Sequence, residues 1–221
     1  YKLSTFELLI NSSLHTQRRP EALKHFKDLE ELCREKSDAR SRLLLNFAFS
    51  AINAVHDWNE ATPDRRRATY DFFKGQKGAT PVISLGLMDL AYSCFRNGEY
   101  KETLSALDEV LSDKESFQQT VVQTQARLLA ILAHYELKNY LLIEYLITNT
   151  KRYLRQHGKL FPFERAVLNG IKHLPEKINE ADMRQYLHTL KTNMEELAKN
   201  PFERNLTRGF NFAGWIEQKL K

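Results

Sequence analysis

Apolar residues recur at intervals of three and four along most of the chain, which is the spacing of amphipathic helices. Segment 20–36 begins at Pro20 and places Phe26, Leu29 and Leu32 on one face. Thr62-Pro63-Asp64 has the residue types of a helix N-terminus, with an N-cap, a proline and an acidic first turn. Continued to the C-terminus, the pattern predicts about ten or eleven helices and no strand.

The last helix is predicted to begin at Pro201, with Asn200 as N-cap and Glu203 closing a capping box. Asn179 and Asp182 have the spacing of another N-terminal cap. Apolar residues in the last helix suggest that it docks onto the body of the protein: Phe202, Phe210, Phe212, Trp215 and Ile216.

Three central segments differ in how much of the helix circumference is apolar. Segments 82–95 and 121–137 are apolar over a wide arc, so we expect neighbours on two sides of each helix. Segment 100–111 has a narrower stripe, which is typical of an outer helix.

The segment that begins at Ala91 aligns with the segment that begins at Ile131 at a constant offset. The aligned pairs are Phe95 with Tyr135, Gly98 with Lys138, Tyr100 with Tyr140, and Leu107 with Ile147. A fainter third copy near the start places Phe6, Leu9, Leu14, Ala22 and Phe26 at similar positions. The alignment predicts a repeated helix–turn–helix unit.

The unit around residues 87–107 resembles a tetratricopeptide repeat, through Leu87, Leu90, Ala91, Phe95, Gly98, Tyr100, Leu104 and Leu107. It departs from that pattern at Thr103, and the second copy departs at Ile131 and Ile143, where small residues are usual. Residues 85–221 also resemble the C-terminal half of a bacterial family of repeat proteins that carries no assigned activity. These resemblances imply no catalytic residue and an N-terminal part that precedes Tyr1.

The expected fold is therefore all-α, a right-handed solenoid of tetratricopeptide-like helix pairs with a helical C-terminal cap. We expect degenerate helix pairs in residues 1–80, the clearer repeats in 81–160, and the cap in 161–221, where Trp215 seals the last repeat.

Composition adds few constraints on function. Lysine and arginine number 33 against 28 acidic residues, and the net charge of +5 makes an acidic partner or nucleic acid worth testing. Cys33 and Cys94 fall on apolar faces, as buried thiols do in a reducing compartment, and we expect a cytoplasmic protein. No apolar run reaches the length of a membrane span.

Catalytic and metal-binding patterns are missing. The seven histidines form neither HxxxH nor HExxH, and His134 stands alone on an apolar helix. Glu102 with Glu109, and Glu195 with Glu196, are better explained as solvated helix faces than as acid–base pairs. The sequence contains no nucleophile elbow, and GQKG lacks the spacing of a phosphate loop. We expect no enzyme, no metal and no cofactor.

Protein binding is the function that remains. In stacked helix pairs the first helices line the concave face, where an extended peptide or a partner helix can lie. The predicted partner-binding residues are Met88, Tyr92, Arg96, Gln125, Leu128, Leu132 and Tyr135. Self-association through the N-terminal repeat is a further expectation.

The alternative is binding of nucleic acid, which we consider unlikely. Segment 151–165 interleaves basic and aromatic residues, the combination that binds single strands. Its basic residues are Lys151, Arg152, Arg155, Lys159 and Arg165, and its aromatic ones are Tyr153, Phe161 and Phe163. Residues 65–67 form a second basic cluster, Arg65-Arg66-Arg67.

Overall fold

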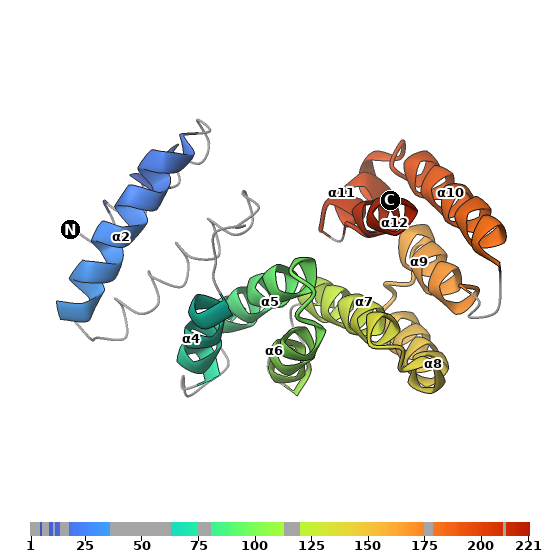
Figure 1. The fold of residues 1–221 in the computed structure, drawn as a ribbon, viewed down its shortest axis with the longest axis horizontal. Helices are drawn as coiled ribbons and strands as arrows, with labels where there is room; N and C mark the ends of the chain where they lie inside the picture. The colour runs from blue at the N-terminus through green and yellow to red at the C-terminus, as the bar shows by residue number, and fades with distance from the viewer. Residues whose placement is uncertain are drawn as a thin grey trace. The chain divides into compact units, whose positions relative to one another are not determined.

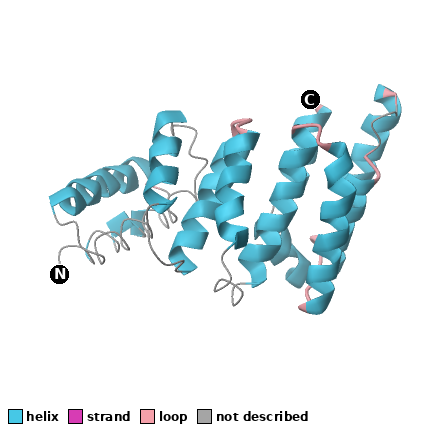
Figure 2. Ribbon diagram, turned by 90° about the horizontal axis from the view of Figure 1, so that it is seen from below, coloured by secondary structure: helices cyan, strands magenta, loops and turns pink. Residues whose placement is uncertain are grey.

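The computed structural model describes residues 5, 9, 10, 12, 13, 18–35, 63–74, 81–112, 120–174, 179–209 and 211–221. Within these ranges every regular element is a helix, so the all-α prediction is confirmed (Figures 1 and 2). The helices are α2 Arg19–Glu35, α4 Pro63–Lys74, α5 Pro81–Arg96, α6 Tyr100–Ser112, α7 Thr120–Glu136, α8 Tyr140–Gln156, α9 Pro162–Lys172, α10 Glu180–Leu197, α11 Pro201–Gly209 and α12 Phe212–Leu220.

The chain divides into two compact units, Tyr1–Val122 and Gln123–Lys221. The solenoid and the division into residues 1–80, 81–160 and 161–221 stay predictions.

In the first unit, α5 packs against both α4 and α6. Five of its apolar residues are buried: Leu87, Met88, Leu90, Ala91 and Cys94. On α6 the buried residues follow one stripe, which includes Ala106, Leu107 and Val110. The wide apolar arc of α5 and the narrow stripe of α6 therefore match the sequence prediction.

The turns after α5 and α7 have the same geometry. After α5, the N–H of Gly98 donates to Phe95 O and the N–H of Glu99 to Cys94 O, at 3.1 and 2.9 Å. After α7, Lys138 and Asn139 donate to the equivalent carbonyls of Tyr135 and His134, at 3.0 and 2.9 Å. Gly98 has φ 76° and Lys138 has φ 59°, so both turns use a left-handed residue to satisfy the last helical carbonyls.

An aromatic pair closes each of these hairpins. The rings of Phe95 and Tyr100 meet edge-on at 5.4 Å, and those of Tyr135 and Tyr140 do so at 5.8 Å. Leu107 and Ile147, which are also aligned, are both buried. The two helix pairs are therefore structural equivalents at the offset that the sequence indicates.

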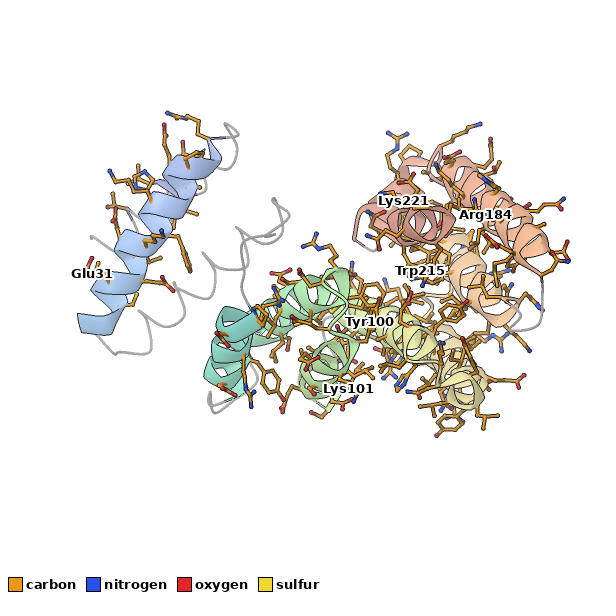
Figure 3. All side chains as sticks on the ribbon, viewed as in Figure 1. Glu31, Tyr100, Lys101, Arg184, Trp215 and Lys221 are labelled. Carbon is orange, nitrogen blue, oxygen red and sulfur yellow. The ribbon has the colours of Figure 1, made fainter. Side chains whose placement is uncertain are left out.

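In the second unit, α9 contacts α8, α10 and α11, while α12 packs against α10 (Figure 1). The prediction that Trp215 docks onto the body is confirmed. Trp215, which Figure 3 labels, is buried. Its ring meets that of Tyr135 edge-on at 5.6 Å, and its indole N–H donates to Glu136 Oε1 at 2.7 Å. Lys219 Nζ binds the other oxygen of Glu136 at 2.7 Å, so this carboxylate holds α12 in place.

Two predicted caps form, and one differs. Asn179 and Asn200 accept hydrogen bonds from the N–H groups of Asp182 and Phe202, at 3.0 and 2.9 Å. Glu203, however, accepts from the N–H of Phe163 at 3.0 Å and so caps α9, a helix far away in the sequence.

The predicted single last helix is in fact two helices, α11 and α12. Asn211 begins the second one by accepting a hydrogen bond from the N–H of Gly214 at 2.9 Å. Asparagine at an N-cap competes with helix continuation, which explains the break. No helix in the described ranges is both long and apolar enough to cross a membrane.

Candidate functional site

Three of the seven predicted partner-binding residues are not on the surface. Met88, Leu128 and Leu132 are buried core residues, so their assignment to a binding face is corrected. On helices that are apolar nearly all round, the sequence period does not say which positions face a neighbour; residues 128–133 are all buried.

The other four predicted residues are accessible to different degrees. Arg96 is exposed, while Tyr92, Gln125 and Tyr135 are half-buried. Burial raises the pKa of the Tyr92 hydroxyl, with a smaller contribution from the charge of Asp89. Tyr92 and Arg96 belong to the first unit, and Gln125 and Tyr135 to the second. A shared concave face stays a prediction.

The two equivalent hairpins differ at three exposed positions of their second helices. On α6 these positions hold Lys101, Glu102 and Ser105, all exposed; Figure 3 labels Lys101. On α8 the equivalent residues are Leu141, Leu142 and Tyr145, which are 100%, 39% and 63% exposed. We call these three residues the apolar α8 patch. Because the hairpins share their turn and their buried positions, the patch is not required by the fold.

A pocket of about 200 Å³ adjoins this helix, between α8 and α9. Six of its lining residues are apolar or aromatic: Tyr135, Tyr140, Ile143, Ile147, Ile171 and Leu174. Glu144 and Lys172 complete the lining and form an ion pair at 3.4 Å. We call this cavity the α8–α9 pocket. It is smaller than the roughly 300–1,000 Å³ of typical small-molecule sites, so its size suits a single bulky side chain.

The C-terminal half of α8 is basic. Lys151, Arg152 and Arg155 form what we call the basic α8 patch, and none of the three makes a salt bridge with a described residue. Lys151 Nζ donates to Asn169 Oδ1 of α9 at 2.7 Å, and Arg152 Nη2 donates to Asn149 Oδ1 at 3.0 Å. Burial lowers the pKa of Lys151, and the charges of Lys172 and Arg155 lower it further. Positive charge therefore gathers along this side of the α8–α9 pair.

The other two residues of the predicted basic segment are directed elsewhere. Lys159 Nζ lies 5.9 Å from the ring centroid of Phe161, and Arg165 Nη2 donates to the carbonyl of Leu160 at 3.3 Å. Phe161 itself packs edge-on against Phe202 at 4.8 Å. These contacts lie in the loop and first turn of α9.

The aromatic residues needed for base stacking are mostly inaccessible. Phe163 is buried, and the buried ring of Tyr153 is covered by the Arg127 guanidinium at 4.1 Å. Stacking requires a free ring face. Binding of single-stranded nucleic acid was expected to use both basic and aromatic side chains. The basic side chains are available, but two of the three aromatic rings are buried.

Within the predicted basic cluster at residues 65–67, the assignment of Arg66 is corrected. Arg66 is only 6% exposed and forms a two-pronged ion pair with Glu99, in which Nε donates to Oε2 at 2.7 Å and Nη2 to Oε1. This pair joins α4 to the turn after α5. Arg66 lowers the pKa of Glu99 mainly through the hydrogen bond. Its charge is therefore neutralised internally.

A second cavity, of about 450 Å³, lies beside this ion pair and is lined by residues of α4, α5 and α6. Its wall includes Leu90, Cys94, Asp64, Asp71 and Glu102 as well as Arg66 and Glu99. Burial, and then the charge of Glu99, raises the pKa of Cys94 to about 12, so the thiol stays protonated and unreactive at neutral pH. In this cavity, Arg66 and Glu99 bind each other, and their ion pair holds α4 in place.

Among the described residues, no group of three or more histidine, cysteine, aspartate or glutamate side chains is placed to hold a metal ion. His134 Nδ1 lies 3.1 Å from Asn139 Nδ2, so it contributes to the turn after α7. In comparisons with known proteins, no protein-family model, characterised protein or solved structure matches this chain.

Proposed function

We propose that the protein is a non-enzymatic scaffold that binds a segment of another protein on α8. One observation carries the proposal. At three equivalent exposed positions, α6 has Lys101, Glu102 and Ser105, whereas α8 has Leu141, Leu142 and Tyr145. Exposed apolar side chains gathered on one helix mark interaction surfaces, and tyrosine is among the residue types that most often anchor a protein interface.

The α8–α9 pocket supports the same function. Tyr140, Ile143, Glu144 and Ile147 follow each other at helical spacing and line this pocket. Leu141, Glu144 and Tyr145 form the adjacent row of the same helix. Glu144 therefore lines the pocket and also lies next to Leu141 and Tyr145 on the helix surface. A partner segment bound on the apolar α8 patch can reach the pocket past this residue. Of the residues predicted to bind a partner, Tyr135 lies in the pocket wall.

The alternative, a helical repeat that binds nucleic acid, keeps the basic α8 patch as its support. It is weakened by the burial of Tyr153 and Phe163 and by the internal pairing of Arg66. The same experiment tests both functions.

Affinity capture from nuclease-treated lysate of the source cells provides the test, with three baits. The first is the wild-type chain, and the second is Leu141→Lys/Leu142→Glu/Tyr145→Ser, which gives α8 the residues of α6. The third is the matched control Lys101→Ala/Glu102→Ala/Ser105→Ala. We expect a protein partner that the wild type and the control retain and the α8 variant loses. Equal capture by all three baits, or loss of every partner after nuclease, contradicts the proposal.

A further inference from the structure

The charge distribution along α8 defines the chemistry of the partner, if the proposed docking on this helix holds. The accessible side of α8 changes character along its length. Its first two turns expose Leu141, Leu142 and Tyr145, and its last two turns carry Lys151, Arg152 and Arg155. A segment that lies along the helix therefore meets an apolar surface at one end and a basic surface at the other.

A single row of side chains connects these two ends. Glu144, Thr148, Lys151 and Arg155 succeed one another at intervals of three and four, and so lie on one side of α8. This side faces α9, because Glu144 pairs with Lys172 and Lys151 binds Asn169. The row thus begins at the rim of the α8–α9 pocket and ends at Arg155.

The cations of this row lack acidic partners among the described residues. Lys151 donates to the neutral amide of Asn169, and Arg155 is exposed. The nearby Lys172 of α9 is different, because it pairs with Glu144. Burial is the largest cause of the lowered pKa of Lys151, and the positive charges of Lys172 and Arg155 lower this pKa further. A carboxylate placed between Lys151 and Arg155 relieves that repulsion and forms charge-assisted hydrogen bonds.

We propose that the partner segment is an acidic peptide with an apolar anchor: one bulky apolar side chain fills the α8–α9 pocket, and Asp or Glu carboxylates bind Lys151 and Arg155. The rise of a helix places these two residues about 6 and 12 Å beyond Ile147 along α8. An extended segment covers that distance in about two to four residues, so the acidic residues follow the anchor at that spacing. All of them lie on the same side of the anchor.

Two other occupants fit the surface less well. Nucleic acid matches the basic patch but leaves the α8–α9 pocket unfilled, and two of the three aromatic rings interleaved with the basic residues, those of Tyr153 and Phe163, are buried. A second copy of the chain can cover the apolar α8 patch, but on its own α8 it offers only Glu144 as an acidic residue. A symmetric contact on α8 therefore leaves the basic patch uncovered or facing itself.

Selection from a random library of displayed twelve-residue peptides tests the proposal, with the whole wild-type chain as the immobilised target. We expect the enriched sequences to share a bulky apolar residue with Asp or Glu two to four positions to one side. An enriched peptide is then synthesised with a fluorophore, and its affinity is measured by fluorescence anisotropy.

The affinity of the peptide is then compared between the wild type and four variants. Glu144→Trp covers the pocket from an exposed position, and Lys151→Glu/Arg155→Glu reverses the basic patch. Leu141→Lys/Leu142→Glu/Tyr145→Ser removes the apolar patch. Arg184→Glu/Lys199→Glu is the matched control, because it makes the same change of charge at exposed positions of α10 and of the turn that follows it. Thermal melts confirm that each variant is folded.

We expect the first three variants to lower the affinity for the peptide at least tenfold, added salt to weaken wild-type binding, and the control to bind like the wild type.

If binding depends on the apolar α8 patch but not on Lys151 and Arg155, or if the enriched peptides lack acidic residues, the acidic partner is wrong and docking on α8 stands. If no enriched peptide depends on the apolar α8 patch, the proposed function itself fails. A dimer in light scattering that Leu141→Lys/Leu142→Glu/Tyr145→Ser abolishes, or displacement of the peptide by a single-stranded oligonucleotide, also overturns the acidic partner.

Discussion

The α5–α6 and α7–α8 hairpins share one backbone geometry but present two different surfaces. Both turn through a left-handed residue, and both close with an edge-on aromatic pair. Around this shared frame, the first hairpin exposes lysine, glutamate and serine where the second exposes two leucines and a tyrosine. Since the same hairpin forms with either group of exposed residues, folding does not require the leucines and the tyrosine, and they can take part in binding.

Charge separates the hairpins in a second way. Glu99 ends the first turn and binds the buried Arg66 of α4, whereas the side chain of its equivalent, Asn139, contacts His134 of its own hairpin. The first turn is therefore secured by a neighbouring helix through an ion pair. In the second hairpin, the charged residues near α8 lie at the rim of a pocket and on the surface instead.

The largest expected effect comes from breaking that ion pair. Glu99→Ala leaves the buried Arg66 without its carboxylate, and we expect the free energy of unfolding to fall by about 3 kcal/mol. The equivalent Asn139→Ala removes one exposed contact and should cost about 0.5 kcal/mol or less. Urea denaturation followed by circular dichroism measures both. Similar losses in the two variants would show that the hairpins do not differ in this way.

The pH dependence of the Glu99 variant gives an independent check. The pKa of Glu99 is lower in the folded protein than its ordinary value of 4.5, so the ion pair stabilises the protein fully above that value. Its contribution is lost as the pH falls through the lower, folded-state pKa. The stability difference between the wild type and Glu99→Ala should therefore be larger at pH 7 than at pH 3. A difference that stays constant would mean that lost packing, not charge, causes the effect.

The left-handed turn residue gives the next largest effect, with opposite signs in the two hairpins. A Cβ on Gly98 meets no atom within 4 Å, so Gly98→Ala costs only backbone strain, about 1 kcal/mol. Lys138 already bears that strain at φ 59°, and Lys138→Gly should raise stability by up to about 1 kcal/mol. Thermal melts of the two variants compare these values. A loss of stability in Lys138→Gly would contradict the equivalence of the turns.

The smallest expected effect on stability comes from exchanging the exposed residues. Leu141→Lys/Leu142→Glu/Tyr145→Ser replaces three exposed side chains, of which Leu142 is the least exposed at 39%, so the free energy of unfolding should stay within about 0.5 kcal/mol of the wild type. The same urea titration checks this value. A loss above about 1.5 kcal/mol would show that these residues support the fold, and would remove the reason for assigning them to binding.

The helices and the repeat could be predicted from the sequence because both are local. The spacing of apolar residues predicts α5 through α8, and the alignment of the two copies pairs Gly98 with Lys138, the left-handed residues of the two turns. The cap that Glu203 places on α9 could not be predicted, since it joins residues distant in the sequence. The break at Asn211 was missed because apolar residues continue on both sides of it.

The candidate site was only partly predictable. The repeat alignment assigns Met88, Leu128 and Leu132 to a partner-binding face, but they are buried, and burial depends on which neighbour covers each side of the helix. Tyr135, Lys151, Arg152 and Arg155 were named, although in two competing sites. The apolar α8 patch was missed, yet its signal was present. The same alignment that pairs Tyr100 with Tyr140 sets Lys101 against Leu141 and Ser105 against Tyr145.

Site-specific photo-cross-linking at Leu141 tests the central claim most directly. A photoreactive phenylalanine analogue is placed at position 141 of one variant and at the equivalent position 101 of another, and both are irradiated in nuclease-treated lysate of the source cells. We predict a covalent adduct with a protein at position 141 that Tyr145→Ser diminishes, and none at position 101. Adducts of equal yield at the two positions, or none at position 141, would contradict the assignment of α8 as the docking helix.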